Sequence, residues 1–70
     1  MFDTEVFTKN LRQLMKDRHI KTKDLAKVLH ITPPHVSHFL VGRQLPRIEM
    51  LYEICELFDV SMDWICGRDK

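Results

Sequence analysis

The sequence predicts an all-α protein that folds as one compact bundle of five short helices. Apolar residues recur three or four positions apart in successive segments, which is the period of a helix buried on one face. Residues typical of helix caps and turns separate these segments, and no segment has the alternating pattern of a strand. A chain of 70 residues is long enough for a single domain, which we place over residues 1–70.

The first two helices are expected on either side of a turn near His19. Asp3 or Thr4 can cap the first helix, and its buried stripe would be Phe7, Leu11, Leu14 and Met15. The second helix is predicted over residues 22–29, with Leu25, Ala26, Val28 and Leu29 on its buried face. Because Ala26 is small, it would allow a neighbouring helix to approach closely.

The third helix has the clearest start signal in the chain, Thr32-Pro33. Threonine can cap free N–H groups, and proline at the first helical position has a suitable φ and no N–H to leave unpaired. The helix should run to residue 40 or 41 and end at Gly42, because glycine adopts a positive φ at the lowest energetic cost. Its inward residues would be Val36, Phe39 and Leu40.

The last third of the chain predicts two more helices after a loop that contains Pro46. The fourth carries an apolar stripe of Ile48, Leu51, Ile54, Cys55 and Phe58. Val60 would fill the core, and Ser61 would cap a short fifth helix over residues 62–66, which Gly67 closes.

Charge is unevenly distributed along the chain, although the net charge is only +1. Residues 9–47 hold nine basic and two acidic residues, whereas residues 48–70 are predominantly acidic. This asymmetry indicates a polyanion-binding face and a separate face turned away from it.

Several classes of protein are disfavoured by what the sequence contains. It has no apolar run of membrane-spanning length and no secretory signal. Cys55 and Cys66 fit neither a metal knuckle nor a disulfide scaffold, which predicts reduced thiols in a cytoplasmic protein. His35 and His38 have a spacing that permits metal binding, but no third ligand accompanies them. We therefore expect no metal, no cofactor and no catalytic site.

Residues 11–67 resemble the lambda-repressor-like, Cro-type helix-turn-helix family. The resemblance lies in an ordered set of residues: Leu25-Ala26, Ile31-Thr32, Val36-Ser37, Phe39, Gly42, Pro46, Leu51, Phe58-Asp59-Val60-Ser61 and Asp63-Trp64-Ile65. It implies that the second and third helices form a helix-turn-helix. It also implies a sequence-specific DNA-binding transcriptional regulator, a Cro-like protein or small repressor, in the cytoplasm and at the nucleoid of a bacterial or phage-infected cell.

Two departures from the family pattern affect the fold and the reading of DNA bases. The family often pairs an arginine and a glutamate where this chain has Met15 and Leu40. Replacing both partners of a partly buried ion pair by packed apolar groups is commonly neutral or favourable, so we expect these two side chains to touch. The third helix opens with Pro33-Pro34-His35, where glutamine, arginine or serine is usual.

The resemblance also assigns residues to DNA contacts. In the family the third helix lies in the major groove, which implies base contacts from Pro33, Pro34, His35 and His38. The corresponding phosphate-contacting positions are Thr22, Lys23, Ser37, Arg43, Gln44 and Arg47. Free N–H groups at helix N-termini would add to these contacts.

Two questions about partners stay open at this stage. Phe58, Met62 and Trp64 would either close the base of the bundle or form the interface of a homodimer on an operator in double-stranded DNA. The alternative to DNA binding is a protein-binding module that uses the same face on a partner repressor. Val41 and Leu45 favour that alternative, because they are apolar where charge would suit a DNA backbone.

Overall fold

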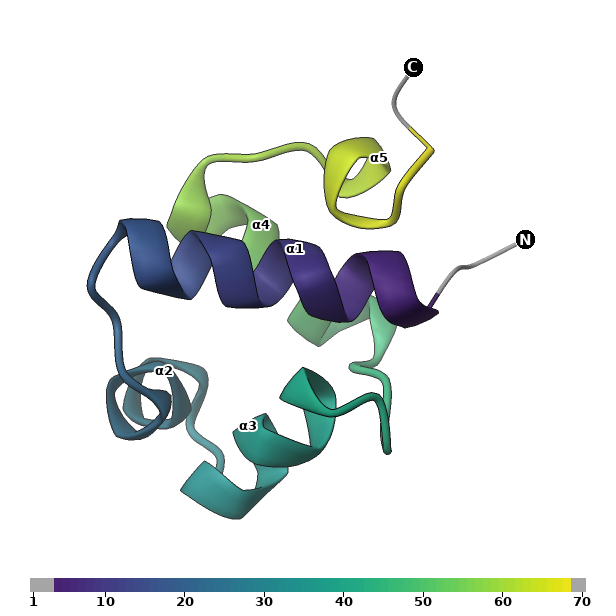
Figure 1. The fold of residues 1–70 in the computed structure, drawn as a ribbon. Coiled ribbons are helices and arrows are strands. Elements are labelled where there is room, and N and C mark those ends of the chain that lie inside the picture. Colours follow the sequence, from purple (N-terminus) through teal and green to yellow (C-terminus); the bar gives the residue numbers. More distant parts are fainter. Residues whose placement is uncertain (1–3, 69–70) are drawn as a thin grey trace.

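Five α-helices joined by short turns make up residues 4–68, the part of the chain that the computed structural model describes (Figure 1). The helices are α1 (Thr4–Asp17), α2 (Thr22–Leu29), α3 (Pro33–Leu40), α4 (Ile48–Phe58) and α5 (Met62–Ile65). This confirms the predicted all-α class and the five helices, with α5 one residue shorter than expected. The predicted cap Asp3 lies outside the described residues.

α1 is the central helix of the bundle. α2 and α3 lie on one side of it, α5 lies on the other, and α4 passes behind it (Figure 1). The radius of gyration is 11.0 Å. In the described part of the chain every buried residue is apolar, and each helix contributes to one core. The largest fully buried side chains are Phe7, Phe39, Phe58, Leu11, Leu25, Ile54, Ile65 and Val36.

Two predicted core residues are instead on the surface. Val28 is 52% exposed and Ile48 is 69% exposed. Residue 28 lies at the edge of the face that Leu25 and Leu29 define, so the short helix α2 turns it outward. Ile48 is the first residue of α4 and lies at the edge of the stripe formed by the later turns. Leu40 and Val60 are only partly buried, although both pack against the core.

The predicted N-cap residues Ser61 and Thr32 differ in whether their hydroxyl groups accept a hydrogen bond from the helix. The hydroxyl of Ser61 accepts a hydrogen bond from the Trp64 backbone N–H at 3.0 Å, as expected. Thr32 has the extended conformation of an N-cap, but its hydroxyl accepts no such bond. A capping hydroxyl needs the N–H of the second or third helical residue. Pro34 has none, and the N–H of His35 is bonded to the Thr32 carbonyl at 3.0 Å.

All five helices end in the same type of turn, with a residue of positive φ. Two of these residues are the predicted Gly42 and Gly67, and the other three are His19, His30 and Asp59. In each turn the following N–H bonds back to a carbonyl five residues earlier, for example Ile20 to Met15 at 2.9 Å. This is the Schellman arrangement, which satisfies carbonyls that a helix end leaves unpaired.

Polar side chains on α1 and just after it supply further donors to the ends of three other helices. Asn10 donates to the carbonyl of Trp64 in α5 at 3.0 Å, and Arg12 donates to Leu40 in α3 at 2.9 Å. Arg18, just after α1, donates to Phe58 in α4 at 2.9 Å. These three side chains therefore help to position the other helices.

Candidate nucleic-acid interface

The turn between α2 and α3 fixes how these two helices are held. His30 has φ +59°, and the N–H of Ile31 bonds to the carbonyl of Ala26 at 2.9 Å. Ala26 is 1% exposed, so α2 contacts its neighbours through a residue with almost no side chain. Thr32 is extended and starts α3 directly afterwards. The result is a helix, a tight turn and a second helix, with α3 on the outside of the molecule (Figure 1).

The predicted base-contacting residues lie on the outer surface of α3. Pro33, Pro34 and Ser37 are exposed, whereas His35 and His38 are half-buried. The ring of His35 rests against Phe39, with 4.8 Å between ring centroids and 49° between the planes. Because Phe39 is fixed in the core, this contact restricts the orientation of the histidine.

A shallow hollow brings several of the predicted residues together. Thr32, Pro34, His35, His38 and Gln44 line this hollow of about 260 Å³. The backbone N–H groups of Arg43 and Gln44 bond to the carbonyl of His38 at 2.9 and 3.3 Å. The loop after α3 is thereby tied to the helix end, so that Gln44 lies next to the histidines.

The first turn of α3 offers no free N–H group for a phosphate, contrary to expectation for this helix. Pro33 and Pro34 have no N–H, and the next two, of His35 and Val36, bond to the carbonyl of Thr32. Any phosphate contact near this end must come from side chains.

The other predicted phosphate-contacting residues flank α3 on both sides. Thr22 and Lys23 begin α2, where Thr22 is half-buried and Lys23 is exposed. Arg43 and Arg47 are exposed in the loop that leads from α3 to α4. Arg47 lines a second hollow with His35 and Gln44, so it belongs to the same surface.

The three residues predicted for a dimer interface have different environments. Met62 and Trp64 are half-buried on α5 and keep exposed surface. Phe58 is 0% exposed and belongs to the core, so its side chain offers no area to a partner. Sequence patterns missed two exposed side chains of α4, Ile48 and Tyr52, because helical spacing alone placed Ile48 inside and gave Tyr52 no role.

The two cysteines are free thiols, and burial raises the pKa of each above its ordinary value. Within residues 4–68, no group of three or more His, Cys, Asp or Glu side chains is arranged to hold a metal. None of the described helices is long and apolar enough to cross a membrane.

The fold and this surface together define a helix-turn-helix domain. A helix-turn-helix family profile matches residues 11–65, and the chain belongs to this Cro- and repressor-type family. A similar protein is the uncharacterized HTH-type transcriptional regulator YqaE of Bacillus subtilis (strain 168), with 28% identity over 60 residues. That alignment covers 86% of this chain and 52% of YqaE, so the chain spans about half of its relative's length. No solved structure matches the chain.

Proposed function

We propose that this domain is a transcriptional regulator that binds operator DNA sequence-specifically by inserting α3 into the major groove. The observation that carries the proposal is the outer surface of α3. Pro33, Pro34, His35 and His38 lie there, with Thr22 and Lys23 on one side and Arg43, Gln44 and Arg47 on the other. An α-helix fits the major groove, and flanking cations neutralise phosphates on either side of it. Family membership supports the same function.

Each group of residues has a distinct role in this proposal. The imidazoles of His35 and His38 donate to guanine O6 or N7, and the two prolines contact thymine methyl groups. Arg43 and Arg47 contact phosphates, and Ser37 and Gln44 add hydrogen bonds to the DNA backbone. Because the first turn of α3 lacks free N–H groups, these side chains set the register of the protein on the duplex.

Selection of binding sites from random duplexes at moderate salt, followed by fluorescence anisotropy, tests this function. We expect a recovered consensus and an affinity that falls steeply with salt, because binding releases counterions from the phosphates. Arg43→Gln should lower the affinity for every duplex, whereas Arg68→Gln, an equal change of charge outside the surface, should not. Recovery of no consensus would contradict sequence-specific binding.

We further propose that the domain forms a homodimer on DNA through Met62 and Trp64. Both residues keep exposed apolar surface on α5, and a symmetric dimer would read two half-sites about one helical turn apart. Met62→Lys should reduce binding to a palindrome to one copy per duplex in sedimentation experiments. Val28→Lys, which changes an exposed apolar residue on α2, is the matched control.

The exposed apolar side chains Val41 and Leu45 support a second candidate function, binding to a partner repressor. They are 59% and 42% exposed; Leu45 lines a hollow with His35 and Arg47, whereas Val41 lies at the end of α3. Apolar side chains offer a DNA backbone neither charge nor hydrogen bonds. In this alternative, any DNA binding would be weak and similar for all sequences. Replacing Val41 and Leu45 by serine would then abolish partner binding, whereas it would leave operator binding intact in a true DNA reader.

A further inference from the structure

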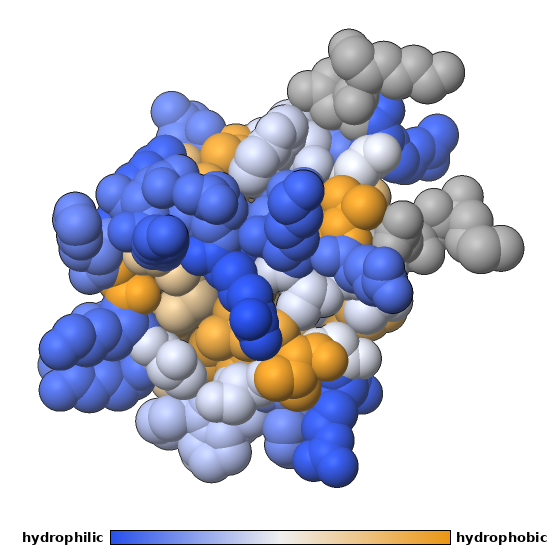
Figure 2. All heavy atoms as spheres, in the orientation of Figure 1, coloured by the Kyte–Doolittle hydropathy of each residue, from blue (hydrophilic) through white to orange (hydrophobic). Residues whose placement is uncertain are grey.

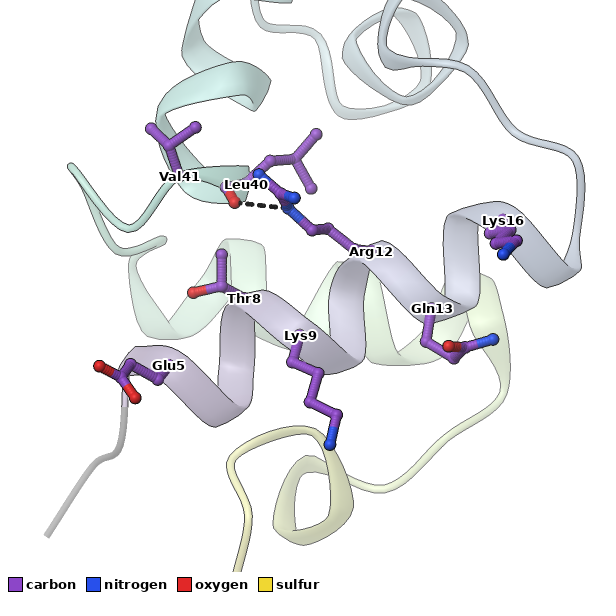
Figure 3. A pocket seen from close by; sticks show the side chains of 8 residues that line it. All are labelled: Glu5, Thr8, Lys9, Arg12, Gln13, Lys16, Leu40 and Val41. Atoms are coloured by element: carbon purple, nitrogen blue, oxygen red, sulfur yellow. Dashed lines mark hydrogen bonds between the residues drawn. The ribbon is translucent and has the colours of Figure 1, made fainter.

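A shallow groove runs between α1 and the end of α3, and none of the predicted base-contacting residues lines it. It has a volume of about 600 Å³. Figure 2 shows hydrophobic atoms at the surface where α3 ends, bordered by hydrophilic side chains of α1. Leu40 and Val41 form the apolar side of the groove. Its α1 side carries three basic residues, Lys9, Arg12 and Lys16, together with Glu5, Thr8 and Gln13 (Figure 3).

The basic residues of this groove are spaced at helical intervals. Lys9 and Lys16 are seven residues apart, so they lie on one face two turns from each other, about 10.5 Å along the helix. Between them Arg12 leans toward α3, where its Nε donates to the Leu40 carbonyl (Figure 3). This bond holds the guanidinium at the border between the apolar and the charged side of the groove.

A complementary stripe lies on α4 of the same chain. Glu49 and Glu56 are exposed and also seven residues apart, with exposed Glu53 close by. Next to these acids, Ile48 and Tyr52 are 69% and 56% exposed, although both are apolar or aromatic. The carboxylate of Glu56, which accepts a hydrogen bond from Tyr52, raises the pKa of that phenol.

The two surfaces match in only one relative direction. When α4 of a second copy lies antiparallel to α1, Glu56 faces Lys9 and Glu49 faces Lys16. Helical geometry then turns Ile48 and Tyr52 to the α3 side of the groove, where Tyr52 lies level with Arg12 and Leu40. In a parallel arrangement the apolar flank of α4 would instead face away from α3, toward solvent.

We propose that this groove binds α4 of a second copy of the chain. The contact uses two different surfaces, so it is head-to-tail and leaves a free groove at one end and a free α4 at the other. Exposed ion pairs are individually weak, so the contact is a weak one between free copies. It gains most from the high effective concentration of copies held side by side, for example at neighbouring sites on one duplex.

Charge reversal with rescue tests the proposal. The wild-type chain at about 50 mM salt should show a weight-average mass that keeps rising with concentration in sedimentation equilibrium. This rise should be lost at about 1 M salt, where the screening length falls to roughly 3 Å. The double variants Lys9→Glu/Lys16→Glu and Glu49→Lys/Glu56→Lys should each lose the association, because their two surfaces now carry like charge. An equimolar mixture of the two should regain it.

The double variant Lys27→Glu/Arg68→Glu is the matched control, since it makes the same change of net charge at exposed residues outside the groove. It should associate at least as well as the wild type, and circular dichroism should show all the variants folded. A mixture that fails to associate would overturn the proposal. It would equally be overturned if Lys9→Glu/Lys16→Glu left self-association unchanged and instead weakened binding to a single DNA site, because the groove would then contact phosphates.

Discussion

The guanidinium of Arg18 binds the carbonyl of Phe58 at 2.9 Å, and its central carbon lies 5.9 Å from the centroid of the Phe58 ring. One side chain therefore caps the end of α4 and covers the edge of the core at the same time. A cation at a helix C-terminus also interacts favourably with the helix dipole. By its sequence position alone, Arg18 would be counted with the basic residues of the presumed DNA-binding face.

Replacing Arg18 by methionine should lower stability by about 1 kcal/mol, because both the charge-assisted hydrogen bond and the cation–π contact are lost. For a domain of this size that corresponds to a decrease of roughly 4–8 °C in Tm. Thermal unfolding followed by circular dichroism measures it. Lys27→Met, the same kind of change on an exposed helix face, should shift Tm little. Equal Tm values for the two variants would show that Arg18 has no capping role.

His19 is not a glycine, yet its backbone lies in the left-handed region, with φ +56°. Such a conformation costs about 1 kcal/mol for most residues and almost nothing for glycine. His19→Gly should therefore raise the free energy of unfolding by a few tenths to about 1 kcal/mol, although glycine also loses more entropy on folding. Urea denaturation measures the change.

Two further variants serve as controls, because each should lower the free energy of unfolding. Lys16→Gly, within α1, should destabilise the protein by about 1 kcal/mol. Gly67→Ala should also destabilise it, because φ is +81° there and the new Cβ would lie 2.6 Å from a methyl carbon of Val6. If His19→Gly destabilised the domain as much as Lys16→Gly, the turn would not have the conformation described.

Burial raises the pKa of both thiols, so each should remain protonated at a pH where an ordinary cysteine is partly ionised. Their alkylation by iodoacetamide at pH 8 should be slower in the folded protein than in urea, and slowest for the buried Cys55.

The raised pKa of the thiols in the folded state also predicts how stability depends on pH. Their contribution to stability is fully present below the pKa of the unfolded thiol and decreases as the pH rises above it. Unfolding measured between pH 8 and 10 checks the sign.

The preference for the consensus over other duplexes should depend on the histidines of α3, because both lie on the proposed base-reading surface. His35 and His38 share their hollow with uncharged Gln44, while Arg47 lies beside His35 in the adjoining one. Anisotropy titrations at constant ionic strength measure this preference. Replacing both histidines by glutamine should remove most of it, whereas Arg43→Ala should preserve it and reduce the salt slope by about one unit.

A double glutamine variant that kept its full sequence preference would argue against the histidines as base readers. Binding to a protein partner would then become the favoured function.

The core and the order of the helices were predictable because they depend on local signals. Apolar spacing identified Phe7, Leu11 and Ile54, and Thr32-Pro33 and Gly42 marked where α3 begins and ends. The candidate site followed from the same segment together with its resemblance to a family. These features need only the helical period and the conformational preferences of single residues.

Tertiary structure decided what depends on neighbours far away in the sequence. Whether Arg12 and Arg18 bind phosphates or helix ends depends on which carbonyls the fold brings near them. Ile48 is 69% exposed although the helical period allows it on the buried stripe, whereas Phe58, expected at an interface, is fully buried in the core. The groove beside α1 likewise exists only because α3 ends next to it. Sequence periodicity describes one helix at a time, whereas burial and hydrogen bonding at these residues are properties of pairs of helices.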